Sequence, residues 1–174
     1  KGSSSVLTAT GPAGTIYTWT TLAGAAVGIG ATQTVSPLAT TSYIVTASGT
    51  CSNSRDTVVV NVSEITAISA GTQTACVAAT NTYTQQVTVT YTNAPVGNIV
   101  INGQSFAITA SPQTVTLTGL SANSASVNVT ANFSGTPSCS TTVNNLFTAP
   151  TACSVTSTLT IGTISPTSYC AGQT

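Results

Sequence analysis

The feature that most constrains this fold is an alternation of apolar and polar residues with a period of two. The stretch from 42 to 62 shows it twice, at Tyr43, Val45 and Ala47 and again at Val58, Val60 and Val62. This period places every second side chain on one face of a β-strand. We therefore expect strands over 42–47 and 56–62, with these residues facing inward. A turn-rich tip containing Cys51 joins the two strands.

Composition favours β-structure for the rest of the chain as well. Only 2% of the 174 residues are charged, whereas an ordinary globular domain has about a quarter. Threonine occupies 38 positions, and the helix formers Glu, Lys, Arg and Met are nearly absent. Alternating aliphatic residues give each segment a face to bury, which disfavours disorder. The chain is predicted to be all-β.

Turn signals divide the chain into many short strands. Asn102-Gly103, between two alternating runs, is the strongest hairpin signal. Residues 138–153 read as a tip that leads into a last strand over 155–161. About seven short strands with turns every 8 to 12 residues is typical of an immunoglobulin-like sandwich. Further strands are expected at 5–10, 15–21, 32–35, 83–92, 98–102, 105–110, 113–118 and 126–133, with weaker strands within 22–30.

These segments group into two tandem β-sandwiches and a remainder. The first sandwich is expected over 1–63 and the second over 64–163, with 64–72 serving as a linker plus a first strand. Residues 164–174 follow the second sandwich as Ser69 to Cys76 follow the first, and each segment contains a cysteine. The tail therefore reads as the opening strand of a third domain.

Charge and hydropathy exclude several functions. A net charge of zero offers no basic surface for nucleic acid and removes a barrier to self-association. No apolar run approaches the roughly 20 residues that span a bilayer, so membrane insertion is not expected. Residues 1–5 lack the apolar region of a signal peptide, which indicates a mature chain or an excised segment.

Catalysis is not expected, and neither is a cofactor or a metal. The chain has no histidine to act as a base at neutral pH. Asp56 and Glu64 lie at opposite ends of one expected strand, roughly 26 Å apart if extended. Asp56 adjoins Arg55, which favours a solvated local pair. An acidic calcium loop needs more carboxylates than this chain has. An enzyme would need a partner chain to bring the catalytic groups.

Five cysteines without C-x-x-C spacing indicate disulfides, and hence an exported protein. Cys76 is expected to bond within the second sandwich, to Cys153 or to Cys139. We favour Cys153 because it stands just before the expected last strand. The odd number leaves at least one cysteine free or bonded to another chain.

The chain resembles the tandem immunoglobulin-like and PKD-like repeats of very large surface proteins secreted by Bacteroidota. The likeness covers essentially the whole chain, but low-complexity strand and turn patterns carry it. In the first repeat these are SVLTATGPAG (5–14), YTWT (17–20) and ATTSYIVTASGTCSNS (39–54), with SYCAGQT (168–174) as an opener. In the second they are VTVTYTNAP (87–95), INGQSFAITASPQTVTLTGL (101–120) and LFTAP (146–150).

The resemblance implies a cell-surface or filament-forming protein exported by the type IX pathway. In such repeats the cysteine-bearing opener directly precedes the first strand that this chain shows, so the 1–63 sandwich is expected to lack its first strand. We expect the 164–174 tail to supply that strand to the next unit, with Cys170 bonded to that unit's Cys51. Such a head-to-tail contact between copies propagates into a filament. A peptide bond or strand addition between subunits could make the link.

Modification by glycans is a further expectation. Asp56-Thr57-Val58 is similar to the short pattern at which Bacteroidota attach O-glycans, which makes Thr57 a candidate. Three asparagines begin N-glycosylation triplets, although chance matches are expected in a chain this rich in Ser and Thr. They are Asn61, Asn128 and Asn132.

Two functions compete. The chain is expected to be a structural repeat of an extracellular fibre or adhesin stalk. The alternative is a carbohydrate-binding accessory module of a secreted enzyme, with surface glycans as partners. Joint exposure of Tyr17, Trp19 and Tyr91 would favour sugar binding, because aromatic rings stack on sugars. Their burial would favour the stalk.

Overall fold

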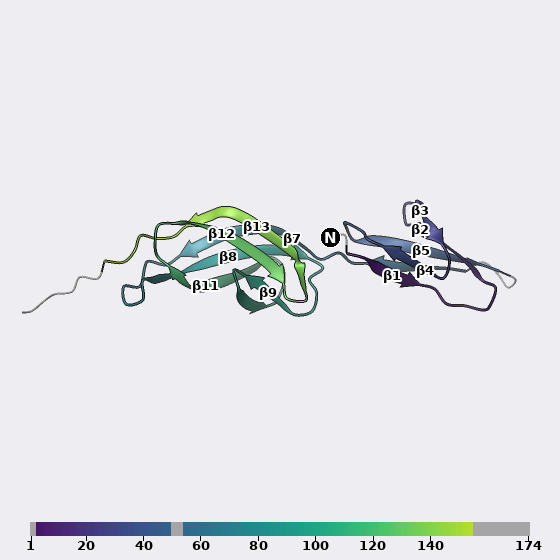
Figure 1. The fold of residues 1–174 in the computed structure, drawn as a ribbon, viewed down its shortest axis with the longest axis horizontal. Coiled ribbons are helices and arrows are strands. Elements are labelled where there is room, and N and C mark those ends of the chain that lie inside the picture. Colours follow the sequence, from purple (N-terminus) through teal and green to yellow (C-terminus); the bar gives the residue numbers. More distant parts are fainter. Residues whose placement is uncertain (1–2, 50–53, 155–174) are drawn as a thin grey trace, which may run out of the picture.

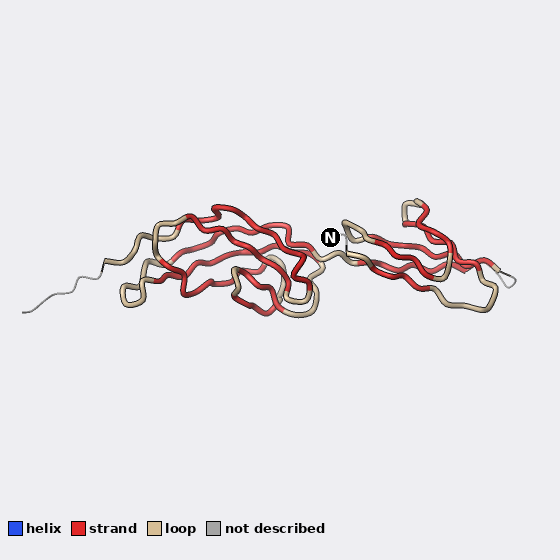
Figure 2. The backbone as a smooth tube through the Cα atoms, viewed as in Figure 1, coloured by secondary structure: helices blue, strands red, loops and turns tan. Residues whose placement is uncertain are grey.

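The structure, a computed structural model, describes residues 3–49 and 54–154. It is all-β, as the sequence predicts, and has no helix in these residues (Figures 1 and 2). Every strand pairing is antiparallel. The strands form two sets with no shared sheet: β1–β6, the N-terminal set, and β7–β13, the C-terminal set.

The N-terminal set has one two-stranded and one four-stranded sheet. The orders are β4-β1 and β3-β2-β5-β6. The central pair of the larger sheet, β2 and β5, places Trp19 opposite Val45. The strands are β1 (Ser5–Thr8), β2 (Ile16–Thr21), β3 (Ala26–Ile29), β4 (Thr32–Val35), β5 (Thr41–Ser48) and β6 (Ser54–Val60).

The C-terminal set has one three-stranded and one four-stranded sheet. The orders are β11-β8-β7 and β10-β9-β12-β13. The strands are β7 (Glu64–Gln73), β8 (Thr82–Thr92), β9 (Asn98–Ile101), β10 (Gln104–Ala107), β11 (Gln113–Ser121), β12 (Ser126–Phe133) and β13 (Thr136–Thr148). Seven strands in two sheets are consistent with the expected sandwich.

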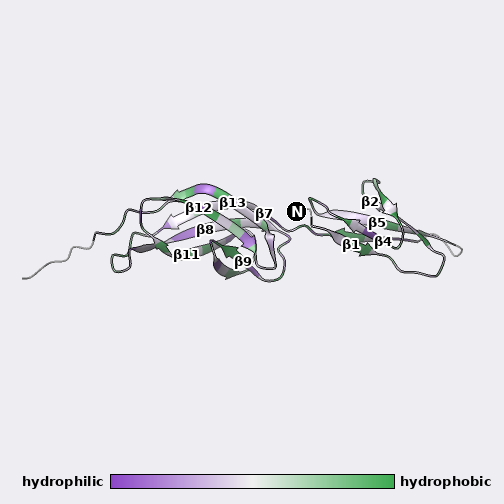
Figure 3. Ribbon diagram, in the orientation of Figure 1, coloured by the Kyte–Doolittle hydropathy of each residue, from purple (hydrophilic) through white to green (hydrophobic). Residues whose placement is uncertain are grey.

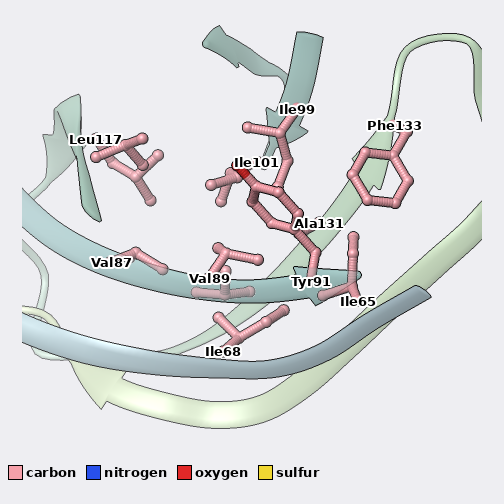
Figure 4. Close-up of a cluster of buried hydrophobic side chains, with 12 residues drawn as sticks. Ile65, Ile68, Val87, Val89, Tyr91, Ile99, Ile101, Leu117, Ala131 and Phe133 are labelled. Atoms are coloured by element: carbon pink, nitrogen blue, oxygen red, sulfur yellow. The ribbon is translucent and has the colours of Figure 1, made fainter. Parts of the chain in front are cut away.

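The two sets differ in the size of their cores. Twelve buried residues form the main cluster of the C-terminal set, where the ring centroids of Tyr91 and Phe133 lie 5.8 Å apart, edge to face (Figure 4). Four buried residues form the cluster of the N-terminal set: Leu7, Trp19, Val35 and Tyr43. Figure 3 shows hydrophobic and hydrophilic residues interspersed along the strands of both sets, as alternation requires.

The Asn102-Gly103 hairpin is confirmed. The two residues join β9 to β10, with Ile101 opposite Gln104. Their φ angles are 45° and 83°, in the left-handed region that a tight two-residue hairpin turn requires.

The expected tip at 138–153 is wrong, because most of it belongs to β13. Within residues 3–49 and 54–154 this strand is at the edge of its sheet, with β12 as its one paired neighbour. Its half-buried positions include Cys139, Thr141 and Val143, alternating with exposed Ser140 and Thr142. The period of two is present in the burial pattern, but most residues of β13 are polar, so the sequence itself shows little alternation of apolar and polar residues. The expected last strand at 155–161 lies outside the described residues.

Two smaller expectations also need correction. Val58 does not face a core, since 40% of its surface is exposed and the neighbouring Val59 is 51% exposed. Both lie on β6, which is at the edge of its sheet. No separate linker precedes β7, because that strand begins at Glu64 itself.

A polar junction connects the two sets. The Asn93 Nδ2 atom donates to Thr40 Oγ1 (2.8 Å) and to the Val62 carbonyl (3.3 Å). Ser63 Oγ donates back to the Asn93 carbonyl at 2.6 Å. Asn93 follows β8 and Thr40 precedes β5, so these hydrogen bonds join the C-terminal set to the N-terminal set.

Candidate functional site

A groove of about 420 Å³ opens between β1 and β6 of the N-terminal set. We call it the β1–β6 groove. Trp19 and Val45, from the central strands of the larger sheet, are among its lining residues. The described lining residues are Val6 to Thr10, Tyr17, Trp19, Val45, Ala47, Ser54 and Asp56 to Val58.

The groove lies between two strand edges. β1 pairs only with β4, and β6 pairs only with β5 within the described residues. The Ala9 N–H donates to the Ala31 carbonyl at 2.8 Å, so Ala9 directs its backbone groups toward the β4 side. Because these directions alternate along an antiparallel strand, Val6 and Thr8 direct their N–H and C=O groups away from β4, toward the open edge.

The groove offers backbone and apolar contacts with almost no charge. Among the lining residues that the structure describes, Asp56 is the one that carries a charge. Its Oδ1 atom accepts the N–H of Thr57 at 2.7 Å. Val6 is 67% exposed and Val58 is 40% exposed, so apolar surface reaches the rim. Such a site suits an extended peptide better than a charged or sugar ligand.

The three aromatic residues that would favour sugar binding are all buried. Tyr17 is 8% exposed, Trp19 is 2% and Tyr91 is 6%. Trp19 Nε1 donates to the Gly30 carbonyl at 2.9 Å. The Tyr91 hydroxyl lies 2.8 Å from Gln113 Oε1 and 2.9 Å from the Thr109 carbonyl. The polar atoms of Trp19 and Tyr91 are satisfied inside the protein, and the three buried rings present no stacking platform.

The disulfide of the C-terminal set is the one that we favoured from the sequence. Cys76 and Cys153 form a disulfide with a Cα–Cα distance of 5.7 Å. Cys139, the alternative partner, is half-buried on β13 and lines a hollow at the junction with Ser5 and Val60. Cys51 and Cys170 lie outside the described residues, as does the 164–174 tail.

Asp56 and Glu64, which were expected at opposite ends of one strand, lie in different sets of strands. Asp56 is on β6 and Glu64 begins β7. Within the described ranges, no three His, Cys, Asp or Glu side chains gather as a metal site would require. No helix in this part of the chain is long and apolar enough to cross a membrane.

The glycan candidates differ in accessibility. Thr57 and Asn61 are exposed, and Thr57 is on the rim of the groove. Asn128 is exposed, but its Oδ1 atom accepts the Asn145 N–H at 2.8 Å. Asn132 is half-buried on β12, and its Nδ2 atom donates to the Phe133 carbonyl.

The groove-lining residues Val6 and Thr8 were not singled out from the sequence, and Val58 was expected only as an inward-facing strand residue. The signal for them was indirect: the expectation that the first sandwich lacks a strand. Comparison of the chain with protein families, characterised proteins and solved structures gives no match.

Proposed function

We propose that this chain is a non-enzymatic structural repeat of an extracellular bacterial fibre or adhesin stalk, in which copies assemble head to tail. The observation that carries the proposal is the repetition of one plan. The order β3-β2-β5-β6 in the N-terminal set matches β10-β9-β12-β13 in the C-terminal set, and β4-β1 matches β11-β8. Repeating one unit along a chain is how extended proteins gain length.

The junction supports a load-bearing role. Asn93 contacts both Thr40 and Val62, so one side chain bridges the two sets. These hydrogen bonds add contacts to the covalent connection at residues 61–63, through which load passes from one set to the other. The disulfide between Cys76 and Cys153 is consistent with an oxidising compartment outside the cytoplasm.

Surface composition supports self-association. Zero net charge leaves little repulsion between copies. Several large apolar residues of the N-terminal set are exposed, including Ile16, Leu22, Ile29 and Leu38. The sugar-binding alternative needs the joint exposure of Tyr17, Trp19 and Tyr91, and this condition is not met.

Electron microscopy combined with sedimentation tests the proposal. The purified chain, at increasing concentration, is expected to form unbranched fibres with a regular axial repeat, and fractions from the native cell surface should contain fibres with the same repeat. A chain that stays monomeric at all concentrations, and whose native form is an isolated module, would contradict the proposal.

A further inference from the structure

The two sets have the same arrangement of strands, except that the C-terminal set has one strand more. Matching the sheet orders aligns β1 with β8, β4 with β11 and β6 with β13. Only β7 has no counterpart within the described residues. In the C-terminal set, β7 pairs with β8 and contacts β13, where Thr141 Oγ1 donates to the Ile65 carbonyl at 3.1 Å. The β1–β6 groove therefore occupies the place that β7 takes in the C-terminal set.

Two isoleucines of β7 fill this place in the C-terminal set. Ile65 is 5% exposed and Ile68 is 7% exposed, and both belong to the main core. Ile65 lies opposite Tyr91 on β8, and Ile68 lies opposite Val89. A strand that fits the β1–β6 groove in the same way needs two apolar residues at this spacing.

The chain contains one other segment with this pattern. Ile65-Thr66-Ala67-Ile68-Ser69 corresponds to Ile161-Gly162-Thr163-Ile164-Ser165, and no other Ile-x-x-Ile-Ser occurs. A cysteine follows each segment, Cys76 in one case and Cys170 in the other. The C-terminal set already contains a segment of this kind, β7, which pairs with β8.

We propose that residues 161–170 of a second copy lie in the β1–β6 groove as an added strand, antiparallel to β1. Ile161 and Ile164 take the places that Ile65 and Ile68 hold beside β8. The strand receives and donates hydrogen bonds at Val6 and Thr8, whose backbone groups face the open edge. This inference rests on the proposed head-to-tail assembly and names the surface that accepts the neighbour.

The direction of the added strand fixes where its cysteine lies. β1 begins at Ser5, which lines a hollow with Val60, and the chain continues past its end at Thr8 to Thr10, which lines another hollow with Ser54. An antiparallel strand therefore ends with Cys170 at the Ser5 end. Cys51 is outside the described residues, and in the sequence it stands between Ser48, where β5 ends, and Ser54, where β6 begins. The inferred strand thus does not support the expected Cys51–Cys170 bond, and assembly should persist when Cys51→Ser is introduced.

A peptide-binding experiment on the full chain tests the inference. The acceptor is the full chain with Ile161→Asp and Ile164→Asp, which cannot donate its own strand. The probe is a synthetic peptide of residues 158–170 with Cys170→Ser. Trp19, the one tryptophan, lines the groove and reports binding by fluorescence. We expect saturable one-to-one binding, at least tenfold tighter than that of a peptide with both isoleucines replaced by aspartate.

Matched acceptor variants locate the contact. Thr8→Pro removes an N–H that faces the open edge, and this should weaken binding at least tenfold. Thr32→Pro is the control: Thr32 lies opposite Thr8 in a pair that does not exchange hydrogen bonds, so its N–H faces the other edge of the sheet. Val58→Asp, on the β6 side, gives a second test if Thr8→Pro does not fold. Val96→Asp, at a 98% exposed position outside the groove, is its control.

Each outcome decides one question. Absence of peptide binding, equal binding of both peptides, or equal loss in Thr8→Pro and Thr32→Pro would overturn the groove inference. If the chain with Ile161→Asp and Ile164→Asp forms as many fibres as the unchanged chain, the groove inference is also overturned. The proposed function would then stand. Specific peptide binding by a chain that never forms fibres would support the groove and overturn the proposed function.

Discussion

Replacing Cys76 and Cys153 by serine tests how the C-terminal set is stabilised. The disulfide closes a loop with a sequence separation of 77 residues. In the chain-entropy model, opening such a loop costs about 4.5 kcal/mol, because the unfolded chain regains freedom. Contacts at the loop ends remain in the folded state, since Asn81 Oδ1 still accepts the Cys153 N–H at 2.9 Å and Asn81 Nδ2 still donates to the Ala122 carbonyl.

This cost is a large part of the stability of an ordinary domain. With a urea m-value of about 2 kcal/mol per molar, the unfolding midpoint of the C-terminal set should fall by about 2 M. Its melting temperature should fall by roughly 20 °C. The N-terminal set, which contains neither cysteine, should keep its midpoint.

The chain offers a means to follow the two sets separately. Trp19 belongs to the N-terminal set and is the one tryptophan, so its fluorescence reports that set alone. Circular dichroism reports both sets. Cys139→Ser is the matched control, because it removes a sulfur and leaves the Cys76–Cys153 loop closed. A loss below about 1 kcal/mol in the double variant, or an equal shift of the Trp19 transition, would refute the reasoning.

Four further outcomes are expected. Trp19→Ala should destabilise the N-terminal set by about 3–5 kcal/mol, measured by circular dichroism, because it empties the centre of a small core. Gln113→Leu should cost the C-terminal set about 2 kcal/mol or more in urea unfolding, because the Thr109 N–H loses its acceptor and the Ala107 carbonyl loses its donor. Burial raises the pKa of Tyr83 above its ordinary value of 10.0. The unfolded chain therefore loses this proton first, so stability should fall as pH rises above about 10, and less steeply in Tyr83→Phe. Melting temperatures should change little between low and high salt, because 2% of the residues are charged.

Much of the fold could be predicted because alternation and turn chemistry act locally. Asn102 and Gly103 tolerate positive φ, which fixes the hairpin whatever surrounds it. The strand expected at 15–21 is present as β2, and it buries Trp19. Spacing alone allowed two partners for Cys76, since Cys139 and Cys153 both follow β12.

The missed features depend on neighbours that a single segment does not reveal. β13 escaped recognition because Thr141 and Cys139 stand where aliphatic residues are usual. Val58 was expected inside because it is on the same face of the strand as Val60, but β6 is at a sheet edge and borders the groove. The groove itself needs β1 and β6 side by side, which only the packing of two sheets provides.

The unequal cores connect assembly to folding. A sandwich of about 60 residues buries a smaller share of its surface than a larger domain does, and the N-terminal set has a four-residue core beside an apolar groove. A strand that binds only the folded set stabilises it in proportion to the logarithm of strand concentration. The N-terminal set should therefore become more stable as fibres form, and the C-terminal set, whose β7 is built in, should not. The chain has almost no charge with which to discriminate between partners. We therefore expect the spacing of the two isoleucines and the direction of β1 to determine which strand binds at the open edge.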